Sequence, residues 1–128
     1  LVDINKKKVD QAIVLNTESL PRHVKNLKSV EKISKVIIGN GTTSRQSIEK
    51  LEFIKNDLII VEEKNTTFRA KKRYFELFPI SGLKTFLPRE IFIMNKNLDA
   101  VSALIILEDY SNHKFTLSEH VDVKTWLK

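Results

Sequence analysis

Three acidic side chains lie where a fold of alternating strands and helices would present its chemistry. Asp3 closes the first predicted strand, and Glu63, with Glu62 beside it, closes the apolar run "DLIIVEE". Asp99 falls in the first turn of an otherwise apolar predicted helix. Because ligands of open α/β sheets bind beyond the carboxyl ends of the strands, these acids are candidates for a shared site.

The residues that follow Asp99 favour its approach to the other two acids. Ser102 and Ala103 share its helix face, and their small side chains would let the helix come close to the sheet. Three converging carboxylates repel one another unless cations compensate them. With no cysteine in the chain, oxygen ligands favour Mg²⁺ or Mn²⁺ over zinc, and paired cations of this kind promote phosphodiester hydrolysis. The pattern therefore predicts a metal-dependent nuclease with Asp3, Glu63 and Asp99 as catalytic residues and metal ligands.

A purely structural explanation exists for each acid. An aspartate at a strand end is commonly a turn residue. An acid in the first turn of a helix is favoured by the helix dipole.

A basic helix follows the acid pair. Residues 64 to 73 contain five lysines or arginines and no acid, which suits a face that tracks a phosphate backbone. Tyr74, Phe75 and Phe78 could stack on unpaired bases, although aromatic side chains on an apolar stripe are more often core, and a basic face is often only solvated. The predicted nucleic-acid contacts are Lys64, Arg69, Lys71, Lys72 and Arg73, together with Thr43, Ser44 and Arg45 of "GNGTTSR".

The segment "GNGTTSR" has two interpretations. It could cradle a phosphate at a helix N-terminus. It lacks the lysine spacing of a Walker motif, however, and fits a plain turn between strand and helix equally well.

Composition indicates one globular domain over residues 1–128. Hydrophobic residues make up 41% and charged residues 30% of the 128 residues, and the formal charge is +6. The positive charge favours a polyanionic partner such as nucleic acid. No apolar run approaches the roughly 20 residues of a membrane span, and no signal peptide is recognisable, so we expect a cytoplasmic protein without a membrane partner, monomeric or weakly dimeric.

Strand signals are concentrated in the first half of the chain. β-branched residues around a lysine turn predict a hairpin, and Pro21 in a third candidate strand favours an edge position. The predicted strands are 1–5, 9–16, one within 18–26, 35–39 and 57–63.

Helix signals are clearest after residue 42. Thr43 and Gln46 are spaced as a capping box, and Thr66 or Thr67 can cap the basic helix, which Pro79 ends. Asn97 caps a final helix that reaches Tyr110, apolar on most sides. Residues 80–96 are expected to form a loop, and residues 111–128 are an extension that we cannot place.

Four stretches together resemble the YqgF family, also called RuvX-like Holliday-junction resolvases, of the ribonuclease H-like superfamily. They are "GNGTTSRQSIEKL", "VEEKNTTFRAKKRYFELFP", "SGLKTFLP" and "LDAVSALIILEDY", and the resemblance runs in order over most of residues 1 to 110. It implies an α/β fold with a central five-stranded mixed sheet, three strands antiparallel and two parallel, flanked by helices. It also implies two Mg²⁺ or Mn²⁺ ions on Asp3, Glu63 and Asp99, and a nuclease that trims the 5′ end of precursor 16S ribosomal RNA or resolves Holliday junctions and other branched DNA.

The first strand departs from the family pattern. Where the family has the form D-x-G, this chain reads Asp3-Ile4-Asn5, and it carries Asp10 where the family has no charge. Asn5 is the least costly replacement for glycine in a left-handed turn. If the altered turn moves Asp3 away from the metals, the protein would be a catalytically weakened nucleic-acid-binding or ribosome-assembly module.

Overall fold

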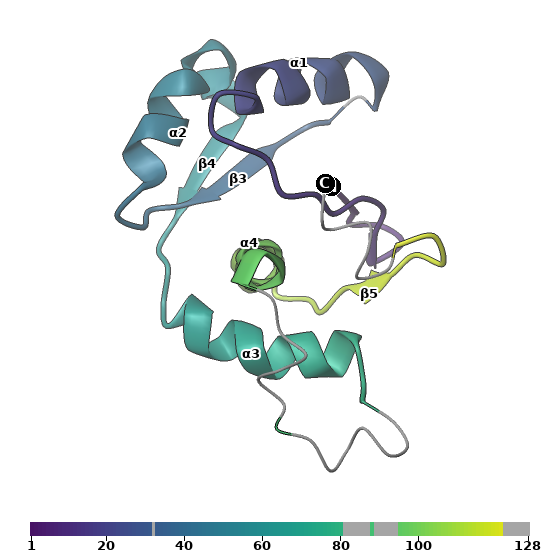
Figure 1. Ribbon diagram of the computed structural model, residues 1–128. Coiled ribbons are helices and arrows are strands. Elements are labelled where there is room, and N and C mark those ends of the chain that lie inside the picture. The colour runs from purple at the N-terminus through teal and green to yellow at the C-terminus, as the bar shows by residue number, and fades with distance from the viewer. Residues whose placement is uncertain (32, 81–87, 89–94, 122–128) are drawn as a thin grey trace. The chain divides into compact units, whose positions relative to one another are not determined.

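The computed structural model describes residues 1–31, 33–80, 88 and 95–121, and its helices and strands are drawn in Figure 1. The chain divides into two compact units. Unit 1 comprises Leu1–Val14 and Asn65–Lys128, and unit 2 comprises Leu15–Lys64.

Unit 2 is built around a pair of parallel strands. In chain order its elements are α1 (Leu20–Val30), β3 (Val36–Gly39), α2 (Ser44–Lys50), the 3-10 helix η1 (Glu52–Asp57) and β4 (Leu58–Val61). β3 and β4 run side by side in the same direction, with Gly39 opposite Val61 at their carboxyl ends (Figure 1). The strands predicted at 35–39 and 57–63 are thus confirmed, each slightly shortened.

A small apolar core holds unit 2 together. Val24 of α1, Leu51 and Ile54 are buried, and Val36 and Leu58 of the two strands pack against them. The core therefore joins α1 and η1 to the strand pair.

The strand predicted within residues 18–26 is wrong, because this segment belongs to α1. Pro21 lies in the first turn of the helix, where its fixed φ suits the helix and its missing N–H has no helical acceptor to lose. Ser19 precedes the helix, and its backbone N–H donates to Asn16 Oδ1 at 3.0 Å. Pro21, from which an edge strand was predicted, instead lies at the start of a helix.

Unit 1 combines a three-stranded sheet of very short strands with two longer helices. Its elements are β1 (Val2–Asp3), β2 (Lys8–Val9), α3 (Thr66–Leu77), α4 (Asn95–Ser111) and β5 (Thr116–Leu117). β1 pairs with β2 antiparallel, and β2 pairs with β5 parallel. The predicted hairpin is confirmed, but its second strand ends at Val9 instead of continuing to residue 16.

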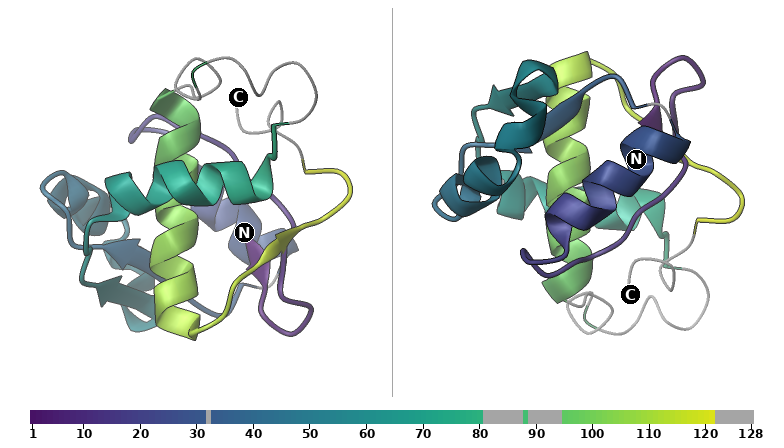
Figure 2. Two further views of the ribbon diagram at one scale, coloured as in Figure 1. Left: turned by 90° about the horizontal axis from the view of Figure 1, so that it is seen from below. Right: turned by 90° about the horizontal axis from the view of Figure 1, so that it is seen from above.

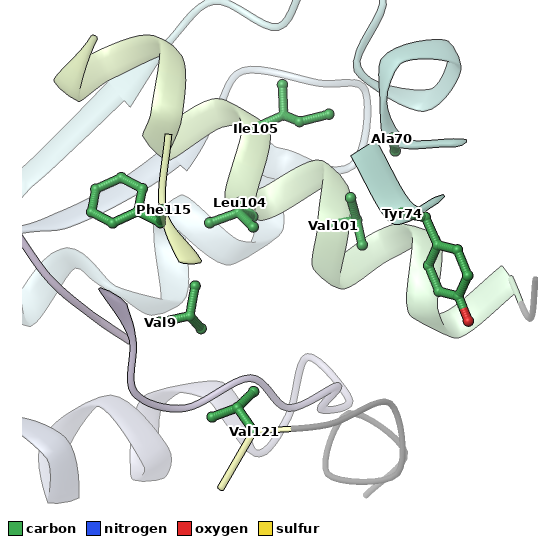
Figure 3. Close-up of a cluster of buried hydrophobic side chains, with 8 residues drawn as sticks. All are labelled: Val9, Ala70, Tyr74, Val101, Leu104, Ile105, Phe115 and Val121. Atoms are coloured by element: carbon green, nitrogen blue, oxygen red, sulfur yellow. The ribbon is translucent and has the colours of Figure 1, made fainter. Parts of the chain in front are cut away.

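The core of unit 1 lies where α3 crosses α4, a crossing seen clearly in Figure 2. Ala70 is fully buried and has almost no side chain, so α3 can approach α4 closely. Figure 3 shows side chains of β2, both helices and the C-terminal segment converging on this cluster. Its buried members are Val9, Ala70, Tyr74, Val101, Leu104, Ile105, Phe115 and Val121.

The C-terminal segment, residues 112–121, was left unplaced by sequence patterns, and it packs on the remainder of unit 1. The Thr116 N–H donates to the Lys7 carbonyl at 3.1 Å and the Ser118 N–H donates to the Val9 carbonyl at 3.0 Å. The Ser118 hydroxyl also donates to Asp10 Oδ1 at 3.0 Å. The extra acid of the first-strand region thus binds the segment that returns along β2.

The predicted fold class is wrong: the strands form one sheet of three and one sheet of two, and no central five-stranded sheet exists among the described residues. Residues expected to supply long antiparallel strands form a strand of two residues and a helix instead. The ladders that would join five strands into one sheet are therefore missing. Most of the predicted loop at 80–96 lies outside the described residues.

Candidate functional site

Glu63 stands just beyond the carboxyl edge of the β3 and β4 pair. The chain leaves β3 at Gly39 and β4 at Val61, and Asn40 ties the two exits together. The Asn40 N–H donates to the Val61 carbonyl at 2.9 Å, and Asn40 Oδ1 accepts from the Glu63 N–H at 3.0 Å. This edge is where a parallel strand pair was expected to present its acid.

The Glu63 side chain lies over the glycine turn between β3 and α2. A Cβ added at Gly39 would meet Glu63 Cγ at 2.5 Å and Cδ at 2.6 Å, and one added at Gly41 would meet Oε2 at 2.8 Å. The space above the turn is therefore filled by a carboxylate. A phosphate cradled by "GNGTTSR" would have to displace Glu63 and overcome its negative charge.

The other predicted contacts on this turn have local partners. Ser44 Oγ donates to the Gly41 carbonyl at 2.6 Å, and Arg45 pairs with Glu49 at 3.2 Å one helical turn later. Thr43 occupies the N-cap position without a side-chain hydrogen bond to the helix, so the predicted capping box is not formed. Thr43 is exposed, and α2 is too short to offer an extended anion site.

Asp3 ends β1 as predicted, but its carboxylate turns to its own hairpin. Oδ1 accepts from the Lys6 N–H at 3.0 Å, and Oδ2 lies 3.6 Å from Lys6 Nζ. The hydrogen bond from the Lys6 backbone, followed by the Lys6 charge, lowers the pKa of Asp3. Asp3 thus acts as a turn residue, the structural explanation that competes with metal binding.

Asp99 is exposed on α4. The helix begins at Asn95, two residues before the predicted cap Asn97, so Asp99 lies one turn further inside the helix than expected. Ala103, four residues on, is also exposed, whereas Val101 and Leu104 are buried. Asp99 therefore lies on the face of α4 that points away from the core of unit 1.

The three predicted metal ligands are divided between the units: Asp3 and Asp99 belong to unit 1 and Glu63 to unit 2. Within the described residues, no group of three or more histidines or acids is placed to hold a metal ion. The exposed carboxylates of Glu63 and Asp99 suit a hard cation by donor chemistry, and Asp3 would first have to release Lys6. The described residues thus supply suitable oxygens in each unit.

Arg73, predicted to contact nucleic acid, instead forms a nearly buried ion pair. Its Nη2 lies 2.7 Å from Glu108 Oε1, and the two side chains are 11% and 9% exposed. Arg73 also donates to the Phe115 carbonyl at 2.6 Å, while Glu108 Oε1 accepts from the Phe115 N–H at 2.9 Å. Arg73 therefore fastens α3 to α4 and to the C-terminal segment.

Arg69 has a similar partner on the same helix. Its Nη1 and Nη2 reach the two carboxylate oxygens of Asp109 at 2.8 and 2.6 Å, a fork geometry typical of strong arginine–carboxylate pairs. The neighbouring acids Glu108 and Asp109 of α4 thus form ion pairs with the two arginines of α3. Lys64 lies 3.4 Å from Glu62 in unit 2.

The outward face of α3 retains lysine and one aromatic ring. Lys71 and Lys72 are exposed and have no ion pair among the described residues, and Phe68 is 79% exposed. These three residues are spaced i, i+3 and i+4, so they share one face, opposite the buried Ala70 and Tyr74. We name Phe68, Lys71 and Lys72 the outer face of α3.

Phe68 was not predicted as a contact, because the clustered aromatic residues at the end of the helix gave the stronger signal. Tyr74 is buried, and its ring contacts Phe75 edge-on at 5.4 Å and Phe78 at 5.1 Å between centroids. These rings serve the core, whereas the i, i+3, i+4 spacing of Phe68 with the two lysines would have identified the exposed ring.

No known protein family, curated protein or solved structure matches this chain. Among the helices of the described residues, none has the length and apolar character needed to span a bilayer.

Proposed function

We propose that this protein acts on structured nucleic acid as a metal-dependent phosphodiesterase, processing the 5′ end of precursor 16S ribosomal RNA or resolving branched DNA in the cytoplasm. The observation that carries the nucleic-acid part is the outer face of α3. Its two lysines are exposed, whereas the arginines of the helix are committed to acids of α4.

The outer face of α3 suits nucleic acid better than a protein or a small anion. Lys71 and Lys72 are neighbours in the sequence and place two positive charges on this face, which suits contact with a phosphate backbone. The exposed ring of Phe68, about one helical turn earlier on the same face, can stack on any unpaired base. A phosphate-only site would have no use for that ring.

The hydrolytic part rests on the resemblance and on the exposed acids. Asp3, Glu63 and Asp99 match the family motifs and are the side chains that would hold Mg²⁺ or Mn²⁺. The ions, when bound, would activate water and stabilise the leaving oxygen. Of the three acids, Glu63 lies at the carboxyl edge of a parallel strand pair, where such a ligand was expected. Its backbone N–H is bound by the Asn40 side chain.

A second candidate is a nucleic-acid-binding module without cleavage activity. It is favoured by one specific observation, the engagement of both Asp3 carboxylate oxygens by Lys6. Such a module would use the outer face of α3 in the same way.

A cleavage assay separates the two candidates. The full chain is incubated with end-labelled precursor 16S RNA and with a four-way DNA junction, in Mg²⁺, in Mn²⁺ and in chelator. Glu63→Gln, Asp99→Asn and Asp3→Asn are tested beside Glu119→Gln, which removes an exposed acid of unit 1 outside the four family-like stretches.

We expect cation-dependent cleavage by the wild type and by Glu119→Gln, and a loss of about 100-fold or more in the other variants. Binding without cleavage by any variant, wild type included, would support the module. Neither binding nor cleavage would overturn both candidates.

A further inference from the structure

The glycine turn after β3 and the Glu63 side chain occupy one shared space. Gly39 is buried at the end of its strand, and Gly41 follows Asn40 in the turn. The carboxyl carbon of Glu63 would lie 2.6 Å from a Cβ at position 39 and 3.1 Å from one at position 41. Ordinary carbon–carbon contacts are about 3.5–4.0 Å, so Glu63 can lie here only because both positions lack a side chain.

The requirement for glycine is one of space and not of backbone conformation. Neither Gly39 nor Gly41 has φ in the left-handed region, so alanine could adopt either backbone without strain. The atoms in the way belong to the end of a flexible, exposed side chain, not to backbone. A methyl group at position 39 would therefore move the carboxylate at little cost in stability.

The backbone of Glu63 is fixed separately. Asn40 binds the Val61 carbonyl through its N–H and the Glu63 N–H through its side chain. The main chain of residue 63 is thus tied to the same turn that leaves room for its side chain. The hydrogen bond to the Glu63 backbone and the space above Gly39 and Gly41 therefore both determine where the Glu63 carboxylate lies.

We infer that the turn formed by Gly39, Asn40 and Gly41 positions the Glu63 carboxylate, with the glycines acting as positioning residues through the volume they leave empty. The functional consequence rests on the proposed function, in which Glu63 is a catalytic acid. Displacing a reacting group by about 1 Å can cost about 100-fold in rate.

The direct test observes Glu63 in the metal-free protein of residues 1–128. Carbon-13 NMR of the assigned Glu63 carboxyl group and the three-bond couplings that report its χ1 are measured for wild type, Gly39→Ala and Gly41→Ala. Thr42→Ala is the matched control, because Thr42 is exposed in the same turn. Thermal denaturation is recorded for each variant.

We expect Gly39→Ala and Gly41→Ala to change the Glu63 shift and couplings while the melting temperature changes by less than about 2 °C. Thr42→Ala should match the wild type. Glycine variants with unchanged Glu63 resonances would overturn the inference. Should Gly39→Ala fail to fold, Gly41→Ala decides alone, because its added Cβ has the milder contacts.

The functional test is the cleavage assay with the same variants. Gly39→Ala should lower kcat about 100-fold and leave KM for nucleic acid unchanged. A wild-type rate despite a displaced Glu63 would overturn the catalytic significance of the turn. If the wild type itself cleaves nothing, the proposed function fails, while the NMR result still decides whether the turn positions the side chain.

Discussion

Arg73 of α3 and Glu108 of α4 meet in a nearly buried ion pair, with Nη2 2.7 Å from Oε1 and Nε 3.1 Å from Oε2. The backbone of Phe115 completes the network by donating to the carboxylate and accepting from the guanidinium. One charged pair thus joins α3 to α4 and to the segment that follows α4.

Removing either member of this pair should destabilise the protein strongly. Arg73→Ala leaves the nearly buried Glu108 carboxylate without its cationic partner, which costs about 3–5 kcal/mol. Glu108→Ala should cost less, because Glu76 still lies 3.1 Å from Arg73 Nη1. A double-mutant cycle in urea measures the coupling. The control cycle uses the exposed pair of Arg45 and Glu49, where about 0.3–0.5 kcal/mol is expected; equal coupling in the two cycles would contradict the structural role of Arg73.

Replacing Lys71 and Lys72 with alanine should weaken nucleic-acid binding mainly at low salt. Each lysine that neutralises a phosphate contributes roughly one unit to the slope of log K against log salt concentration. Titration of a labelled RNA by fluorescence anisotropy at several salt concentrations measures that slope. Lys50→Ala, an exposed lysine of α2, is the control, and a double variant with the wild-type slope would exclude the outer face of α3 as the contact.

Phe68→Ala should weaken binding to single-stranded nucleic acid without altering stability. Stacking of one base on an aromatic ring contributes about 1–3 kcal/mol, and a side chain that is 79% exposed adds little to the core. Val30→Ala removes a comparably exposed apolar side chain, 76% exposed, from α1. Equal affinities for the two variants would argue against stacking.

Phe115→Ala should detach the C-terminal segment from the remainder of unit 1. The side chain is only 1% exposed, and loss of a fully buried phenylalanine costs about 3–5 kcal/mol. Urea denaturation measures the change, and hydrogen exchange should show that the amide of Ser118 loses protection. Persistence of that protection would mean that the segment docks through its hydrogen bonds alone.

Stability should fall in acid because two aspartates have depressed pKa values. The hydrogen bond from Arg69 lowers the pKa of Asp109, and the hydrogen bond from Lys28 lowers that of Asp57. A lowered folded-state pKa contributes stability above the unfolded value, near 3.8, and this contribution is lost as the pH falls through the folded value. Urea midpoints between pH 6 and pH 2 should therefore drop less steeply for Asp109→Asn and Asp57→Asn than for the wild type; parallel curves would contradict the assignment.

Elements with strong local patterns were predictable from the sequence. The apolar runs gave β3 and β4, and the apolar stripe with Pro79 gave α3, whose observed span is Thr66–Leu77. In these segments, the periodicity of a few neighbouring residues is enough to fix the structure. The position of Glu63 after β4 follows directly from the same local pattern.

Features that depend on distant partners were not predictable. Arg73 was expected to face solvent because its partner Glu108 lies 35 residues away, and charge alone does not reveal a partner. The α1 segment was misread since Pro21 suits both an edge strand and the first turn of a helix. Sheet assembly failed for the same reason, because pairing between strands is set by contacts that no single window of sequence contains.

The contact between the Gly39 turn and Glu63 makes two separate positions share a fixed volume. A larger residue at 39 would displace the side chain at 63 unless residue 63 were shortened, and a swap that places the side chain at 39 and glycine at 63 would free this space while deleting the acid. In any redesign or variant library of this protein, the two positions should therefore be varied jointly, because the residue at 39 decides where the side chain at 63 can lie.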